Sequence, residues 1–125
     1  MQEHEVYEAI GDSGFTRLVA EFYRGIPSDP VLGPMYPADD LPGAAERLRG
    51  FLIFRFGGPQ TYLQQRGHPR LRMRHAPFAV TPTARDHWLS HMARALEAAD
   101  IPAEVVSVMQ KYFEQTAAFL INRPE

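Results

Sequence analysis

The sequence predicts an all-helical protein in which two packed pairs of helices leave room between them. Apolar residues recur at helical spacing in four long segments, and no segment shows the alternation and hairpin turns of paired β-strands. The long connections between these segments are rich in proline and glycine, which favours separated helix pairs. A chain of 125 residues supports one hydrophobic core, so we expect a single domain over residues 1–125.

Two consecutive helices are expected at the start of the chain. Residues 5–10 form a short helix that Gly11 stops, and Asp12 or Ser13 caps the next helix over residues 14–26. The apolar stripe of this second helix consists of Phe15, Leu18, Val19, Phe22 and Ile26. Tyr23 lies beside the stripe, and the pattern alone indicates an ordinary boundary tyrosine.

A loop and a long helix follow. Five prolines between residues 27 and 42 force repeated turns, with at most one helical turn near residues 29–32. Tyr36 in this loop either fills the core or faces a ligand. Asp39 or Asp40 caps a helix over residues 41–56, which ends at Gly57, and its inner face carries Ala44, Leu48, Phe51, Leu52 and Phe56. Its large apolar residues serve either core packing or one wall of a flat ligand.

The segment from His68 to Phe78 carries the most distinctive pattern, after a polar stretch over residues 59–68 that we expect to be irregular. Pro69 can start a short helix and Pro77 ends it, so His75 lies at a helix C-terminus. Leu71 shares the face of His75, whereas three arginines of this helix, Arg70, Arg72 and Arg74, point elsewhere. An imidazole with cations around it suits a ligand with a central metal and carboxylates at its edge, although a solitary histidine is usually a hydrogen-bonded core residue.

Two further helices complete the chain. Thr81 and Pro82 begin a helix over residues 82–99, whose inward stripe is Trp88, Met92, Ala95, Leu96 and Ala99. A last helix over residues 102–122 has the most regular apolar stripe of the sequence and is interpreted as core. His87 and His91 are four residues apart and could share a zinc ion, but the remaining residues of a zinc hydrolase motif are missing. We therefore expect both histidines to face solvent.

Composition excludes several functional classes. With no cysteine, disulfides and thiolate chemistry are impossible. The formal net charge of −2 gives no reason to expect nucleic acid or an anionic membrane as a partner. No secretory leader or membrane span is recognisable, so a cytoplasmic protein is expected. The motifs of nucleotide-binding and acyl-transfer enzymes are also missing.

Several separated motifs together resemble a truncated haemoglobin of the second group. They are Phe22-Tyr23, Tyr36-Pro37, Asp39-Asp40-Leu41, Gly57-Gly58-Pro59, the whole run from Arg66 to Phe78, and Asp86-His87-Trp88-Leu89. The resemblance spans about residues 5 to 122. One departure is Asp12-Ser13 between Gly11 and Gly14, where the family commonly has adjacent glycines.

The resemblance implies a two-over-two helical sandwich around haem b, with helices 14–26 and 41–56 crossing helices 82–99 and 102–122. It makes His75 the iron ligand and matches Tyr23, Tyr36 and Trp88 to the polar residues on the opposite, distal side. Ala44 occupies the position of the distal histidine of longer globins. The other expected haem contacts are Leu48, Phe51, His68, Leu71, Arg72, Arg74, Phe78, Trp88 and Met92.

The implied function is reversible binding of dioxygen and other diatomics, such as NO and CO, with high affinity and slow release. Three polar distal residues favour slow release, which suits redox detoxification of NO or peroxide better than bulk oxygen transport. A catalytic cycle needs a reductase, for which the sequence has no signature. The alternatives are a haem-based oxygen sensor or store without turnover, and a helical interaction module without cofactor. A homodimer also stays open.

Overall fold

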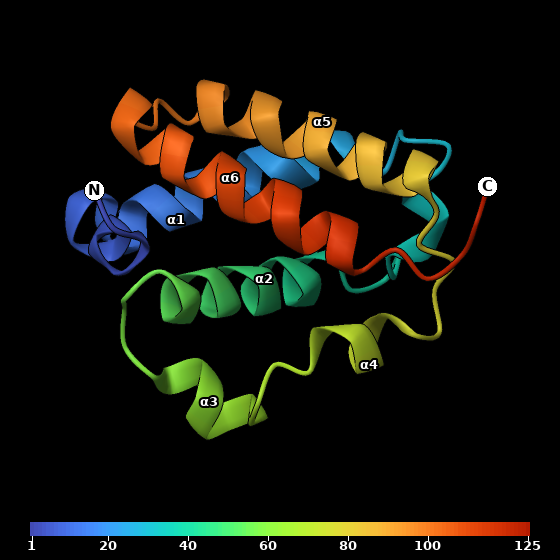
Figure 1. Cartoon of the computed structure of the whole chain (residues 1–125), viewed down its shortest axis with the longest axis horizontal. Helices are drawn as coiled ribbons and strands as arrows, with labels where there is room; N and C mark the ends of the chain where they lie inside the picture. Colours follow the sequence, from blue (N-terminus) through green and yellow to red (C-terminus); the bar gives the residue numbers. More distant parts are fainter.

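Every regular element of the computed structural model, which describes residues 1–125, is a helix (Figure 1). In chain order they are η1 (Glu3–Glu5), α1 (Val6–Gly25), η2 (Gly33–Met35), α2 (Leu41–Arg55), α3 (Thr61–Arg66), α4 (Leu71–His75), α5 (Pro82–Ala98) and α6 (Ala103–Phe119). The predicted fold class is therefore confirmed. None of these helices is both long and apolar enough to cross a membrane.

Two pairs of long helices make up the body of the fold. α1 packs against both α5 and α2, and α5 packs against α6. In Figure 1, α6 lies between α5 and α2 while α1 passes behind them, and the short helices α3 and α4 lie beyond α2. The largest fully buried side chains come from all four long helices and the residues that directly follow α1 and α2: Val6, Phe15, Leu18, Phe22, Ile26, Leu52, Phe56, Met92, Leu96, Val105 and Met109.

Helix α1 contains the break that the sequence predicts. Gly11 has φ 63° and ψ −179°, a conformation that an L side chain rarely adopts, so the backbone changes direction there although the helix carries one label. Three residues later, a Cβ on Gly14 would come within 2.6 Å of the Ile10 Cβ. The two glycines thus permit the bend and the close approach of the turns on either side of it.

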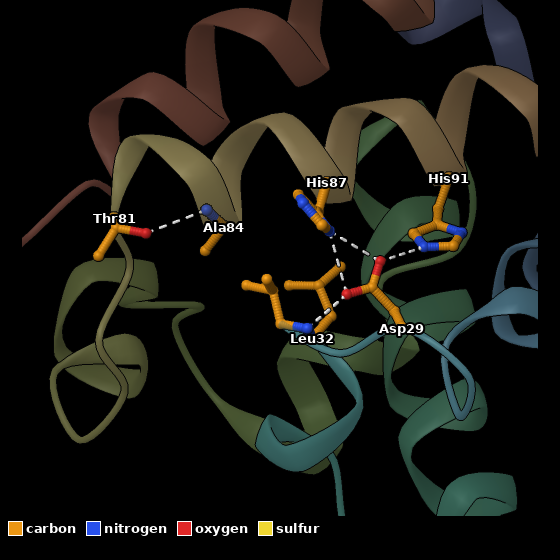
Figure 2. A network of polar contacts seen from close by, with 7 residues as sticks. Asp29, Leu32, Thr81, Ala84, His87 and His91 are labelled. Carbon is orange, nitrogen blue, oxygen red and sulfur yellow. Dashed lines mark hydrogen bonds and ion pairs between the residues drawn. The ribbon is translucent and has the colours of Figure 1, made fainter. Parts of the chain in front are cut away.

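The helix starts that matter for the cavity described below are capped as expected. The Asp40 carboxylate accepts a hydrogen bond from the Gly43 N–H at 3.1 Å at the start of α2. The Thr81 hydroxyl oxygen accepts one from the Ala84 N–H at 3.0 Å at the start of α5 (Figure 2). Each cap satisfies a backbone donor that the helix itself leaves free.

Four local predictions differ from the structure. Residues 61–66, expected to be irregular, form α3, although of its residues only Tyr62 is buried. α4 begins at Leu71 rather than Pro69, because Arg70 has a left-handed backbone with φ 45° and cannot belong to the helix. The helical turn expected at residues 29–32 is followed by η2 at Gly33–Met35, and α6 ends at Phe119, three residues before the predicted end.

Candidate functional site

A cavity of about 430 Å³ opens between α2, α4, the start of α5 and the C-terminal half of α6. Of its 25 lining residues 18 are hydrophobic, and this size and lining are typical of a pocket for a small organic ligand. Two sets of its lining side chains matter most for its chemistry. We call α4, with Leu71, Arg74 and His75, the histidine wall, and we call Tyr23, Tyr36 and Trp88 the aromatic wall.

The histidine wall presents one imidazole in a defined tautomer. His75 Nδ1 lies 2.7 Å from the carbonyl oxygen of Leu71, one helical turn earlier. Since a carbonyl oxygen can only accept, Nδ1 must carry the proton and donate it. Nε2 of the neutral ring then keeps a free lone pair, on a residue that lines the cavity. This is the arrangement in which histidine serves as a metal ligand, with its second nitrogen fixed by a backbone carbonyl.

Arg74 ties the histidine wall to the segment before it. Its guanidinium donates to the Tyr62 hydroxyl at 3.1 Å and to the carbonyl oxygens of Arg66 and His68 at 2.9 and 3.3 Å. On the other side of α4, the Asn122 side-chain amide donates to the carbonyl oxygens of His75 and Phe78 at 3.3 and 3.0 Å. These contacts hold a helix that buries none of its own residues.

The aromatic wall is a set of edge-to-face contacts. The Tyr23 and Tyr36 rings have centroids 5.5 Å apart at an interplanar angle of 87°. Phe22 joins the wall to the core, because its ring lies 5.1 Å from Tyr23 and 5.2 Å from Trp88. Phe113 of α6 packs against the other side of Trp88 at 5.4 Å. Edge-to-face packing is favourable for aromatic rings, so the orientations of these side chains are fixed by several partners at once.

Both tyrosines of this wall stay protonated at neutral pH. Burial raises the pKa of Tyr36 to about 12, although the Trp88 side chain, as a hydrogen-bond donor, lowers it slightly. Burial also raises the pKa of Tyr23, and the neighbouring Tyr36 hydroxyl raises it further. Because a phenol donates a hydrogen bond only while it keeps its proton, the wall offers two hydroxyl donors and the indole N–H.

A carboxylate clamp fixes the loop that carries Tyr36 to the helix that carries Trp88 (Figure 2). Asp29 accepts hydrogen bonds from His87 Nδ1 at 2.9 Å and His91 Nε2 at 2.7 Å, both on α5. It also accepts the backbone N–H groups of Val31 and Leu32 at 2.8 Å. Burial alone would raise the pKa of Asp29, but these four hydrogen bonds together hold it well below its ordinary value.

The clamp overturns one prediction. His87 and His91 were expected to face solvent, but their side chains are only 34% and 19% exposed and both bind Asp29. His91 also packs closely against the end of α1, since a Cβ on Gly25 would come within 2.7 Å of His91 Nδ1. No group of three or more His, Asp or Glu residues is arranged to hold a metal ion.

The charges around the cavity are of one sign. Four arginines line it, Arg47, Arg66, Arg74 and Arg85, and no carboxylate does. A flat ligand with an apolar body, a central metal and carboxylates at its edge matches this donor set, since the imidazole, the apolar walls and the cations each meet one of its parts. The lining residues therefore fit haem.

The structure gathers most of the predicted site residues at this cavity. Tyr23, Tyr36, Ala44, Leu48, Phe51, Leu71, Arg74, His75, Phe78 and Trp88 all line it. Three others do not: Met92 is buried in the core with 1% exposure, His68 is exposed, and the Arg72 guanidinium lies 5.0 Å from the Phe119 ring. Their haem contacts stay predictions without support from the cavity lining.

Sequence reasoning missed part of the cavity. Arg47 and Arg85 are not among the predicted site residues, and Arg66 appears only as the start of a motif. The last helix is predicted as core, but α6 contributes five residues to the lining: Tyr112, Phe113, Thr116, Ala117 and Leu120. Thr116 and Ala117 interrupt the run of large residues in the stripe of that helix, and this was the one signal that its C-terminal half faces something other than packed core.

Comparison with known proteins gives a consistent result. The family model described as "Bacterial-like globin" matches residues 5–122. Group 2 truncated hemoglobin YjbI of Bacillus subtilis is 38% identical over 119 residues, which cover 95% of this chain and 89% of that protein. The hemoglobin of Chloroflexus aurantiacus is 50% identical with a TM-score of 0.89, covering 94% of this chain and 98% of that one. A truncated haemoglobin from Bacillus subtilis, described as oxygen-avid, is 38% identical with a TM-score of 0.88, covering 93% and 98%.

Proposed function

Because the chain belongs to the bacterial-like globin family, among the group II truncated haemoglobins, we propose that it holds haem b in this cavity and binds dioxygen tightly for redox detoxification. Membership of the family implies haem-based ligand binding. The observation that carries the finer proposal is that one free imidazole nitrogen and three side chains with protonated donor groups line the same apolar cavity.

We propose His75 as the sole protein ligand of the iron. The hydrogen bond from Nδ1–H to the Leu71 carbonyl oxygen fixes the ring and makes Nε2 a better electron donor. His75 would hold the haem through Nε2, and the haem iron would supply reversible binding of a diatomic ligand. Arg74, and beside it Arg47, Arg66 and Arg85, would take the carboxylates at the edge of the haem.

The aromatic wall is proposed to hold the diatomic ligand. Dioxygen draws electron density onto its oxygens when it binds, so donors aimed at it stabilise the complex, whereas carbon monoxide draws less. The Tyr23 and Tyr36 hydroxyls are donors because burial keeps them protonated. Trp88 can only donate, through its indole N–H. With about 1 kcal/mol for each net hydrogen bond, two donors slow ligand release by roughly tenfold to thirtyfold.

Slow release of dioxygen favours a function in which the bound dioxygen reacts, because a carrier has to release it quickly. The Bacillus subtilis relative is described as oxygen-avid, and we extend that property to this chain. Oxidation of nitric oxide, NO + O₂ + e⁻ → NO₃⁻, makes use of dioxygen that is held and shielded from water. Each turn of this reaction consumes one electron, so a reductant has to act between turns. Peroxide, with two electrons and two protons, gives two molecules of water in the same way.

The test begins with the visible spectrum of the purified protein, in which a Soret band establishes haem. The ferrous protein, loaded with dioxygen, is then mixed with nitric oxide in a stopped-flow instrument, and nitrate is measured. We expect one nitrate for each haem in a single turnover. If dioxygen dissociates slowly but no nitrate forms and no peroxide is consumed, the result would favour an oxygen store or sensor without turnover. A protein without a Soret band after reconstitution would contradict haem binding altogether.

A further inference from the structure

The charges of this chain are segregated along the sequence. Residues 47–85 contain eight of the thirteen cationic residues and no carboxylate, whereas the other 86 residues hold five cations and fifteen carboxylates. The cationic segment runs from α2 through α3 and α4 to the first turn of α5. In Figure 1 the short helices of this segment lie together, beyond α2 and on one side of the molecule.

Six of these eight cations either form an ion pair or line the cavity. Arg47, Arg49, Arg55 and Arg85 form ion pairs with Asp40, Glu46, Glu3 and Asp86. Arg66 and Arg74 line the cavity, where the proposed function assigns them to the haem carboxylates. Arg70 and Arg72 remain: both are exposed, and neither has a carboxylate partner. Arg72 belongs to α4, and Arg70 directly precedes it.

Exposed apolar side chains surround these two arginines. Met73 and Phe119 are 58% exposed and Phe78 is 39% exposed, and only Met1 among the other large hydrophobic residues is similarly open. The Arg72 guanidinium lies 5.0 Å from the Phe119 ring, which joins α4 to the end of α6. We call Arg70, Arg72, Met73, Phe78 and Phe119 the α4 patch. Arginine, methionine and phenylalanine are the residues that protein interfaces favour.

The α4 patch borders the cavity. Phe78 belongs to both, since it lines the cavity and is exposed at the surface. It lies one turn beyond His75, and its N–H donates to the His75 carbonyl oxygen at 2.9 Å. A protein bound to the patch therefore stands at the edge of the cavity, next to the proposed iron ligand. Electron transfer requires such an approach, and transient electron-transfer complexes manage with small interfaces.

We propose that the α4 patch is the docking surface for an acidic electron-transfer protein, which delivers the electron that each detoxification turn consumes. This inference rests on the proposed function. Two free cations beside three apolar side chains match an acidic patch with an apolar centre on a protein. They are fewer than the four to eight cations of a typical anionic-lipid site, or the phosphate contacts of a typical nucleic-acid site.

The test measures how fast a reduced acidic flavoprotein, flavodoxin, reduces the ferric haem-loaded protein. Stopped-flow absorbance gives the second-order rate constant between about 20 and 300 mM salt. We expect the constant to fall at least tenfold over this range, because salt screens attraction between exposed charges. The double variant Arg70→Glu/Arg72→Glu should lose at least tenfold at low salt and should lose the salt dependence. Reduction by dithionite, a small molecule, should be unchanged in the single variant Arg70→Glu, which alters no predicted haem contact and should by itself slow reduction by flavodoxin.

Arg24→Glu/Lys111→Glu is the matched control, since Arg24 of α1 is 75% exposed, Lys111 of α6 is exposed, and both lie outside residues 47–85. It makes the same change in net charge as the double variant of the patch and should alter the constant less than twofold. A salt-independent constant for the wild type, or an equal loss in both variants, would overturn the docking surface. The proposal would also be overturned if the patch variant lost binding to phosphatidylserine vesicles or to DNA but was still reduced by flavodoxin at the wild-type rate. The single-turnover nitrate assay uses pre-reduced protein and no partner, so its failure points to the proposed function instead.

Discussion

The two walls of the cavity are built in different ways. The aromatic wall grows out of the core: α1 and α5 bury six and four of their residues, and Phe22, which packs on both Tyr23 and Trp88, is fully buried. The histidine wall stands on α4, a helix of five residues that buries none. Local stability follows buried apolar contacts, so the donors that face the ligand are set by the fold itself. The helix with the proposed iron ligand depends on a few side-chain hydrogen bonds and on what binds to it.

The largest expected effect concerns the histidine wall. His75→Ala removes the proposed axial nitrogen, and with a contribution of about 3 kcal/mol or more, haem transfer to a scavenging apoprotein should accelerate by about a hundredfold or more. His68→Ala is the control and should leave the rate unchanged, since His68 does not line the cavity. An unchanged five-coordinate ferrous spectrum in His75→Ala would contradict the assignment.

The difference between the two walls should also appear in the haem-free wild type, in which amide hydrogen exchange should be faster in α4 than in α1 or α5.

The next effect separates hydrogen bonding from packing in the aromatic wall. Trp88→Phe keeps most of the apolar bulk but removes the indole donor, which should cost about 1.5 to 3 kcal/mol with bound dioxygen. Dioxygen dissociation should then become roughly tenfold to hundredfold faster, and carbon monoxide dissociation should change less. Tyr36→Phe and the double variant should give non-additive effects, because both donors serve one ligand. Equal acceleration for the two gases, measured by stopped flow, would show that Trp88 acts by steric closure.

A smaller effect tests the clamp behind the aromatic wall. Asp29→Asn weakens the contacts to His87 and His91 and should lower the free energy of unfolding by about 1 to 2 kcal/mol, measured by denaturant titration. Asp86→Asn is the matched control on α5, where the carboxylate is 67% exposed, and should stay within about 0.5 kcal/mol of the wild type.

The pH dependence of the same variant has a definite sign. The folded-state pKa of Asp29 is lowered, so the carboxylate contributes stability that is fully present above its unfolded value of 3.8 and is lost as the pH falls below it. The difference in unfolding free energy between the wild type and Asp29→Asn should therefore be constant from pH 6 to 5 and should shrink towards pH 3. A difference that grows on acidification would contradict the clamp.

The smallest expected effect concerns the arginines that line the cavity. Arg74→Ala removes one of four cavity arginines and its bonds to Tyr62 and two carbonyl oxygens, and partly exposed charge pairs contribute at most about 1 kcal/mol. Haem loss should accelerate by up to about fivefold. Lys111→Ala, an exposed cation of α6 that does not line the cavity, should have no effect. Equal haem-loss rates in Arg74→Ala and the wild type would exclude the contact with the haem carboxylates.

The two walls also differed in how far the sequence could predict them. The four long helices follow from the spacing of apolar residues, and Trp88 faces inward as that spacing predicts. α3 was missed because only Tyr62 of its six residues is buried, which leaves no apolar stripe to recognise. The spacing of apolar residues describes one helix at a time, so it does not detect a short polar helix that is held by its neighbours.

The clamp shows a second limit of sequence reasoning. Asp29 lies 58 residues before His87 and 62 before His91, and nothing local connects a carboxylate in a proline-rich loop with two histidines on a later helix. The spacing of the two histidines places them on one face of the helix, and the pattern predicts that this face points to solvent because it lies opposite Trp88 and Met92. Contacts of this kind depend on how helices cross, which the pattern of a single helix does not determine.

The contacts of Asn122 bear on the order in which the protein is made. Its side chain binds the His75 carbonyl oxygen across 47 residues of sequence, and it also exchanges hydrogen bonds with Val80. A ribosome adding about 5 to 20 residues per second needs roughly 2 to 10 s to pass from His75 to Asn122. During that time the histidine wall exists without its second support. Haem that arrives during this interval therefore meets a histidine wall held only through the Arg74 contacts, and the second support forms once Asn122 has been added.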